Sequence, residues 1–228
     1  MKKIVSFVLV LLVCFSLYGC KKEEVIVDDD SEINKPINSE NIELKKLVAV
    51  QDLGYIPGEY ELGLILFKVS NSNSKSVRVN INIEYYDPAN NKIDSDEIYA
   101  RVGTNRATYT MVRMYPEKQK FNSYKYTYSV TPDDGYEEMF SKVGVLYSKS
   151  NGKVSIKTTN SSSRVTTAVI YVVFYNSGKI IDVKDYYEYD VTSGSSKTGT
   201  VDFPVDKYGR KMAFDKVEVI LEQVSTDL

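Results

Sequence analysis

The 228-residue chain contains no histidine, and this absence excludes several classes of chemistry. Ser-His-Asp and Cys-His catalysis, acid–base catalysis by imidazole and ordinary zinc sites all need that side chain. Tryptophan is also absent, and the two cysteines, Cys14 and Cys20, both lie within the first twenty residues. Carboxylate chemistry, Ser-Lys chemistry, a metal site made of oxygen ligands, or no chemistry remain open. We favour the last of these.

The first nineteen residues have the pattern of a processed export signal. Lys2 and Lys3 form a short basic region, and the apolar segment 4–15 is too short to span a membrane as a stable helix. The closing residues Leu17-Tyr18-Gly19-Cys20 resemble the lipobox of bacterial lipoproteins. The resemblance implies cleavage just before Cys20 and a diacylglycerol thioether on its sulfur. The expected location is therefore extracytoplasmic, with the chain lipid-anchored to the bacterial cell membrane.

Cleavage there would leave a mature chain without a free thiol or a disulfide, because Cys14 is removed and Cys20 carries the lipid. Loss of Lys2 and Lys3 would change the formal net charge from −2 to about −4. A nucleic-acid-binding protein instead has clustered Lys and Arg on a basic domain, so we predict no nucleic-acid partner. The membrane, reached through the lipid on Cys20, is the first predicted partner, and no cofactor is predicted.

Residues 20–43 have the composition of a flexible tether. The stretch is charged and mostly polar, includes Pro36, and has too few apolar residues for a core. Its basic residues Lys21 and Lys22 can lie against anionic lipid headgroups. A calcium site at the acidic run 28–30 is the alternative, but the run lacks the spaced oxygen ligands and turn glycine of a calcium-binding loop. We therefore predict a solvated acidic spacer.

An internal repeat organises the rest of the chain. The sequence Asn-Ser-Asn-Ser-Lys at 71–75 and the sequence Asn-Ser-Ser-Ser-Arg at 160–164 each precede a strand, and the two segments align at a constant offset without a gap. Tyrosine is abundant and β-branched residues are frequent, as in mostly β proteins. The predicted fold class is all-β: two tandem immunoglobulin-like antiparallel β-sandwiches at 44–131 and 137–228, after the lipoprotein signal (1–19) and the tether (20–43).

Alternation of apolar and polar residues locates the strands. In the first copy, Val77, Val79, Ile81 and Ile83 alternate with polar residues, which indicates one buried face and one wet face. The turn sequence Thr-Pro-Asp-Asp-Gly at 131–135 separates the two copies. The predicted strands are 46–53, 61–70, 77–86, 92–102, 107–115 and 124–130 in the first copy, and 142–148, 153–158, 164–175, 179–191, 197–203 and 216–224 in the second.

The second copy resembles the FxLYD-type domain of bacterial lipoproteins. The resemblance is carried by Asn160-Ser161-Ser162-Ser163, by Phe174-Tyr175-Asn176 and by Gly178-Lys179-Ile180-Ile181. The first copy departs from the pattern, because Asn90-Asn91 stands where a Gly-Lys turn is usual. The resemblance implies an immunoglobulin-like β-sandwich in an envelope protein, and it carries over no catalytic residue.

One strand of the second copy is apolar on both faces. Tyr171, Val173 and Tyr175 belong to a face whose counterpart in the first copy is mostly polar. Two interpretations fit this pattern: the face contacts the other sandwich, or it is a patch that binds an envelope protein. We favour a contact between the sandwiches, because tandem modules commonly bury some surface against each other.

Tyr187 and Tyr189 form a second candidate surface. On a strand they share one face with Asp185, and aromatic rings beside an acid can stack on sugars and hydrogen-bond their hydroxyl groups. The simpler interpretation, which we favour, is that tyrosine is a common strand residue with an apolar ring and a polar tip. A cell-wall glycan is therefore the alternative ligand.

The densest group of carboxylates in the first copy is Asp94-Ser95-Asp96-Glu97. Glycoside hydrolysis needs two carboxylates held across a scissile bond in a pocket. Charged residues on a strand also commonly prevent its edge from pairing with another sheet, and we favour this second role. No catalytic residue and no metal ligand is predicted.

The predicted function is that of a non-enzymatic, membrane-anchored envelope lipoprotein that acts as a binding, adhesion or spacer module. The alternative is an accessory module that binds cell-wall glycan through tyrosine-rich strand faces. The sequence leaves open which partner is bound, whether the membrane is an inner or an outer one, the oligomeric state, and whether the sandwiches dock rigidly.

Overall fold

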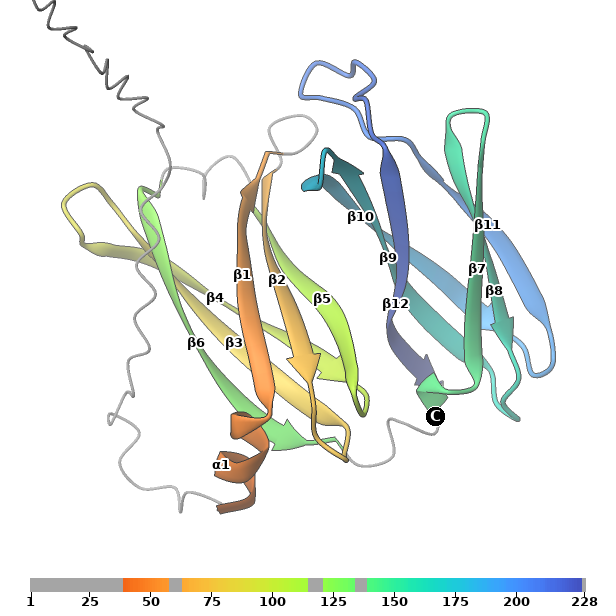
Figure 1. The fold of residues 1–228 in the computed structure, drawn as a ribbon, viewed down its shortest axis with the longest axis horizontal. Helices are drawn as coiled ribbons and strands as arrows, with labels where there is room; N and C mark the ends of the chain where they lie inside the picture. The colour runs from red at the N-terminus through yellow and green to blue at the C-terminus, as the bar shows by residue number, and fades with distance from the viewer. Residues whose placement is uncertain (1–38, 58–62, 115–120, 134–138, 227–228) are drawn as a thin grey trace, which may run out of the picture.

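The computed structural model describes residues 39–57, 63–114, 121–133 and 139–226, and Figure 1 shows their fold. They form one short helix and twelve strands, arranged in four antiparallel sheets of three strands each. The predicted all-β class is confirmed. No helix among these residues is long and apolar enough to cross a membrane. The predicted signal, the lipidation site Cys20 and tether residues 20–38 lie outside the described residues.

Helix α1 (Ser39–Lys46) occupies the end of the predicted tether, so residues 39–43 are helical rather than part of a flexible spacer. Glu40 lies in its first turn and two lysines lie in its last, which suits the helix dipole. Leu44 is buried in the core of the first copy, and the Lys75 ammonium lies 2.8 Å from the Glu40 carboxylate. The helix is therefore held against the sheets by a buried leucine and an ion pair.

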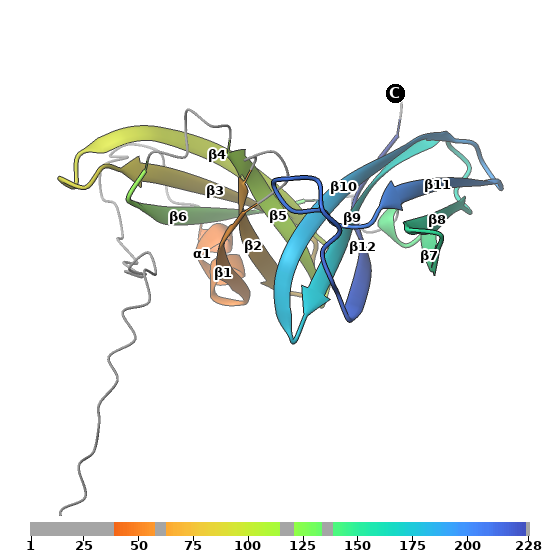
Figure 2. The ribbon, with the colours of Figure 1, turned by 90° about the horizontal axis from the view of Figure 1, so that it is seen from above.

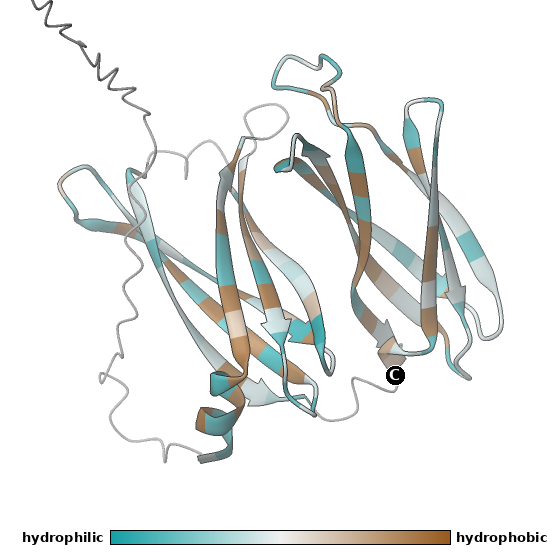
Figure 3. Ribbon diagram, in the orientation of Figure 1, coloured by the Kyte–Doolittle hydropathy of each residue, from teal (hydrophilic) through white to brown (hydrophobic). Residues whose placement is uncertain are grey.

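The first copy is a pair of facing sheets, which we call the N-terminal sandwich. Along its β3 strand, Val77, Val79, Ile81 and Ile83 are fully buried and alternate with more exposed residues, an alternation that Figure 3 shows as colour along the strand. These residues lie in a core shared by both sheets. One sheet has the order β1 (Val48–Ile56), β2 (Gly63–Asn71), β5 (Arg106–Met114), and the other has the order β4 (Lys92–Val102), β3 (Val77–Tyr86), β6 (Ser123–Pro132).

The second copy, the C-terminal sandwich, repeats this topology. Its strands β7 to β12 take the places of β1 to β6, in both the order and the pairing of strands. Its own core includes Ile156, Ile170 and Phe174. One sheet has the order β7 (Val143–Ser150), β8 (Lys153–Asn160), β11 (Ser196–Asp202), and the other has the order β10 (Lys179–Val191), β9 (Thr166–Asn176), β12 (Lys216–Thr226).

The turns that revealed the repeat contain a buried asparagine with the same role in each copy. The side-chain amide of Asn71 donates to the carbonyl oxygen four residues further on and to that of Val102, at 2.9 and 3.1 Å. The amide of Asn160 likewise donates to the carbonyl four residues on and to that of Val191, at 2.7 and 2.8 Å. In both copies the side-chain oxygen accepts from the backbone N–H two residues on. Each asparagine thus ties its turn to the last residue of the neighbouring hairpin.

A third apolar cluster joins the two sandwiches. It brings Ile56, Leu64 and Leu66 of the sheet β1-β2-β5 together with Tyr171 and Val173 of the sheet β10-β9-β12. The four sheets therefore form a stack in the order β4-β3-β6, β1-β2-β5, β10-β9-β12, β11-β8-β7. Figure 2 shows this arrangement, with β9 and β10 beside the N-terminal sandwich and β7, β8 and β11 on the far side.

Candidate binding surfaces

Strand β9 is apolar on both faces because both faces are covered. One face lines the C-terminal core, and the other packs on the N-terminal sandwich, where Tyr171 is 8% exposed and Val173 is fully buried. Leu64 and Leu66 of β2 belong to the same cluster. Tyr171 and Val173 therefore belong to the contact between the sandwiches. Because both side chains are buried there, they do not form an exposed patch for an envelope protein.

Tyr175 adds a polar element to the same contact. Its hydroxyl lies 3.1 Å from the hydroxyl of Tyr109 of β5 and donates to Glu218 of β12 at 2.7 Å. Burial and these hydrogen bonds raise the pKa of the Tyr175 hydroxyl. At the rim, Arg113 of β5 forms an ion pair with Asp185 of β10. The two sandwiches are thus joined by apolar packing, a hydroxyl pair and an ion pair.

Glu222 is a buried acid at this contact that the sequence did not single out. It lies in β12 at a β-bulge, where the pairing with β9 shifts register, and it is 4% exposed. Burial raises the pKa of its carboxyl group to about 8, and the nearby Arg101 of β4 opposes the shift. Its charge also contributes to the raised pKa of Tyr171, although burial is the larger cause there. The carboxyl group therefore holds its proton to a higher pH than an exposed glutamate does.

Tyr187 and Tyr189 lie together on the edge strand β10. Their rings are stacked, with centroids 5.9 Å apart and planes at 12°, and they are 45% and 57% exposed. The neighbouring Asp185, predicted to accompany the rings, is engaged with Arg113 across the contact between the sandwiches. The structure therefore brings the two rings together as an exposed aromatic pair whose acid faces the N-terminal sandwich.

The outer face of the sheet β4-β3-β6 lies at one free end of the stack. A surface groove of about 670 Å³ lies over the part of this face that holds Asn82, Glu84 and Tyr86, and it is lined from all three strands. The strand register sets polar and aromatic side chains in rows across this face. The rows, in the order β4, β3, β6, are Tyr99-Asn80-Ser129, Glu97-Asn82-Thr127, Ser95-Glu84-Lys125 and Lys92-Tyr86-Ser123; Arg78 precedes Asn80 on β3.

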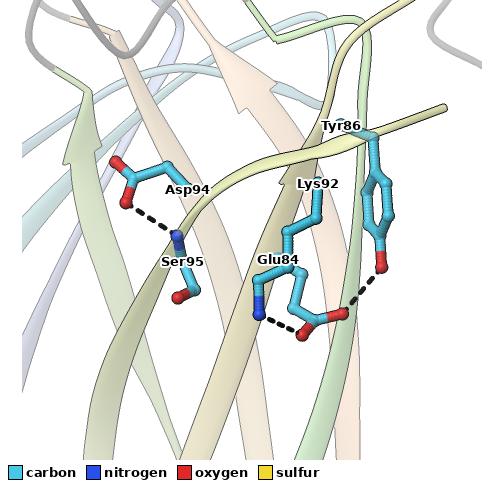
Figure 4. Close-up of polar contacts among 5 residues, drawn as sticks. All are labelled: Glu84, Tyr86, Lys92, Asp94 and Ser95. Atoms are coloured by element: carbon cyan, nitrogen blue, oxygen red, sulfur yellow. Dashed lines mark hydrogen bonds and ion pairs between the residues drawn. The ribbon is translucent and has the colours of Figure 1, made fainter. Parts of the chain in front are cut away.

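Hydrogen bonds fix the side chains at one end of this outer face, as Figure 4 shows. The Glu84 carboxylate accepts from the Lys92 ammonium at 2.5 Å and from the Tyr86 hydroxyl at 2.7 Å. The ammonium of Lys125 lies 5.0 Å from the centroid of the Tyr86 ring. The hydrogen bond to Glu84, with some burial, raises the pKa of Tyr86, so its hydroxyl remains a donor.

Tyr99 occupies the other end of the outer face. Its ring is 42% exposed, and the guanidinium carbon of Arg78 lies 4.3 Å from the ring centroid. The central strand between these two tyrosines presents Asn80 and Asn82. The sequence contains a signal for this surface, because asparagine is uncommon within strands and here occurs twice on one face.

The predicted carboxylate group is divided between two faces of β4. Ser95 and Glu97 belong to the outer face, whereas Asp96 accepts a hydrogen bond of 2.9 Å from the buried Tyr85. Asp94 accepts from the backbone N–H of Ser95 at 2.8 Å. Among the described residues there is no cluster of three or more side chains of the kinds that ligate metals.

No protein-family model and no curated protein matches the chain. Among solved structures, red sea bream transglutaminase has a TM-score of 0.25 at 8% identity over 70% of this chain, and this chain spans 27% of its length. The C-terminal globular domain of an oligosaccharyltransferase from Pyrococcus abyssi has a TM-score of 0.19 at 10% identity, covering 79% and 47% of the two chains. The chaperone YadV has a TM-score of 0.15 at 11% identity, covering 79% and 99%. These likenesses are too weak to assign a family.

Proposed function

We propose that this protein is a lipid-anchored, extracytoplasmic envelope lipoprotein that acts without catalysis, as a binding, adhesion or spacer module. Lipid on Cys20 would hold the chain at the membrane. Residues 21–38 would serve as the tether, and the stacked sandwiches would carry the binding surfaces. The lipobox-like sequence before Cys20 supports the anchor, and the docking of the sandwiches supports the non-catalytic role.

The observation that carries the non-catalytic role is the location of the groups with perturbed pKa values. Such groups commonly mark active sites that open to a cleft. Here Tyr171, Tyr175 and Glu222 have raised pKa values and lie where the two sandwiches meet, and Tyr85 and Tyr186 have raised pKa values in the cores of the two sandwiches. Burial is the largest cause of the shift for each of these five groups. A stack of fixed geometry on a tether suits a protein that presents a surface at a distance from the membrane.

The anchor is tested by metabolic labelling with a fatty acid in a bacterium that processes lipoproteins. The wild-type chain is expected to carry the label and to fractionate with membranes, because the thioether forms on Cys20. The Cys20→Ser variant is expected to lose the label and the membrane association. Cys14→Ser is the matched control and is expected to behave as wild type. A labelled Cys20→Ser variant would contradict the proposed anchor.

The non-catalytic role is tested on intact cells. Crosslinking of the wild-type chain is expected to capture a specific envelope component. Hydrolysis of an envelope substrate that is lost in Asp94→Asn or Asp96→Asn would instead show an enzyme and overturn this part of the proposal.

A second candidate function is the binding of cell-wall glycan by Tyr187 and Tyr189. The stacked, exposed geometry of the two rings favours it, because such rings offer a flat apolar platform with polar tips. Binding to purified cell wall that is lost in the Tyr187→Ala, Tyr189→Ala double variant would support this function. Binding that is unchanged in the double variant would exclude these rings as the glycan site.

A further inference from the structure

We propose that the outer face of the sheet β4-β3-β6 is a binding site for a neutral oligosaccharide, with Asn80 and Asn82 as its central polar contacts and Tyr86 and Tyr99 at its two ends. The proposal rests on the proposed function in one respect, because an envelope location gives the face access to glycan. It assigns the ligand to a different surface from the Tyr187–Tyr189 pair.

The two asparagines are the strongest sign of a ligand. Asparagine is depleted in strands, yet Asn80 and Asn82 lie in the middle of the central strand and on one face. Their equivalents in β9 are Val169 and Tyr171, which are residues that strands favour. Within the described part of the chain, neither carboxamide has a hydrogen-bond partner. Residues that are disfavoured in a strand and make no compensating contact within the fold are typical of functional positions.

The aromatic residues set the length and the character of the site. Tyr86 lies six residues along β3 from Asn80, and Tyr99 lies directly opposite Asn80, so the two tyrosine positions are roughly 20 Å apart along the strand at 3.3 Å per residue. That distance spans several linked sugar rings. Each tyrosine offers an apolar ring with a polar hydroxyl, and the carboxamides between them can both donate and accept hydrogen bonds. This combination matches a chain of rings with hydroxyl groups at their edges.

The charges of the face favour a neutral ligand. Three basic residues, Arg78, Lys92 and Lys125, lie among two acidic ones, Glu84 and Glu97, which leaves an excess of one positive charge, and Lys92 is already paired with Glu84. A polyanion would need a cluster of basic side chains without nearby acids. The contacts of Glu84 with Lys92 and Tyr86 also hold these side chains in place before a ligand arrives, which lowers the entropy lost on binding.

The position of the face in the repeat supports its use for recognition. The equivalent face of the C-terminal sandwich, on β10-β9-β12, already binds a partner, namely the sheet β1-β2-β5. In the N-terminal sandwich the same face lies at the free end of the stack (Figure 2). The other free end, the outer face of β11-β8-β7, presents Ser155, Lys157, Thr198 and Thr200 in its central rows and offers a comparison surface without tyrosine or asparagine there.

The test uses the full chain, purified in a detergent without a sugar headgroup, and a tetramer of β-1,4-linked N-acetylglucosamine as the probe. Binding is followed by ¹H–¹⁵N NMR, which detects the asparagine side-chain amides directly. We expect saturable binding that moves the amide signals of Asn80 and Asn82. The double variant Asn80→Thr, Asn82→Thr is expected to lower the affinity at least tenfold. Its unfolding temperature is expected to stay equal or rise, since threonine suits a strand better.

Two controls separate binding from folding. Ser155→Asn, on the outer face at the opposite end of the stack, is expected to leave the affinity unchanged. Asn82→Asp keeps the shape of the side chain but removes its N–H donors, so it is expected to weaken binding. This variant provides a second test of the site in case the double variant is less stable than the wild-type chain. Weakened binding in Asn82→Asp with unchanged unfolding would support the proposal.

Three outcomes would overturn the proposal: no saturable binding by the wild-type chain, an unchanged affinity in the asparagine variants, or binding that is lost in Tyr187→Ala, Tyr189→Ala instead. The last outcome would move the ligand to the aromatic pair of β10. The labelling of Cys20 is measured separately, so failure of this site and failure of the proposed anchor are distinguishable.

Discussion

The ionisation of the Glu222 carboxyl group is linked to the contact between the sandwiches. Its side chain is 4% exposed, and its neighbours include Arg101 of β4, Tyr171 of β9 and Tyr187 of β10. Burial raises the pKa of its carboxyl group to about 8, whereas an exposed glutamate titrates near roughly 4.3. The docked form therefore holds the proton more tightly than a form in which the carboxyl group is exposed.

The expected consequence is a loss of stability as the pH rises. At a pH below the pKa that Glu222 has in the unfolded chain, the carboxyl group is protonated in both the folded and the unfolded state, and the stabilisation is complete. This stabilisation decreases as the pH rises from there to about 8, the pKa of Glu222 in the folded chain. The free energy of unfolding should fall in this interval by at most about 1.4 kcal/mol per pH unit. Denaturant titrations at pH 5 and pH 8 measure the fall. Glu222→Gln should remove most of it, and an equal fall in that variant would contradict the assignment to Glu222.

Asn71 and Asn160 provide a second prediction for single residues. Each buried carboxamide makes at least three hydrogen bonds that close its turn. Replacing either with alanine leaves buried backbone groups without partners, so each variant should lose roughly 2–4 kcal/mol of unfolding free energy. Chemical denaturation measures this loss. Asn122→Ala, at an exposed position, is the control and should change the stability by less than about 0.5 kcal/mol.

Among the elements, the strands could be predicted from the sequence, including β9, and helix α1 could not. The alternation in β3 identifies its buried side directly, because side chains on a strand alternate between faces. Strand β9 is apolar on both faces, which favoured a contact between the sandwiches, and the fold identifies the sheet β1-β2-β5 as the surface that it contacts. Helix α1 was missed because it buries only Leu44 and so has no apolar period. Glu222 was missed because its bulge depends on pairing with β9.

Strand β11 shows how an element can depend on a residue without a side chain. A Cβ atom on Gly199 would lie 1.8 Å from the hydroxyl oxygen of Tyr186, whose ring packs on the C-terminal core. Gly199→Ala should displace that ring and its hydrogen bond to Glu188, with a loss of roughly 1–3 kcal/mol of unfolding free energy. Thermal unfolding checks the effect. Gly144→Ala, on β7 of the same sheet, meets nothing within 4 Å, and an equal loss there would contradict this explanation.

At the scale of the whole fold, the described residues form a stack of two repeats with an apolar contact between the repeats in its middle. Leu66 on the docking face of the N-terminal sandwich is fully buried, whereas Ser155, which takes its place in the C-terminal sandwich, lies on a free face. Polar terminal faces are what repeat proteins need for solubility, and here they end the stack after two modules.

The matched positions of Leu66 and Ser155 allow the docking to be tested directly. Leu66→Asp would place a carboxylate against Tyr171 and Val173, and a charge without a partner is not retained in such a site. Each sandwich keeps its own core, so the variant should separate into two folded modules on a common chain. Small-angle X-ray scattering should then show a larger radius of gyration, and calorimetry should show two unfolding transitions. Ser155→Asp should change neither property. An unchanged radius of gyration in Leu66→Asp would mean that the sandwiches stay docked without the third apolar cluster, and it would contradict the role assigned to that cluster.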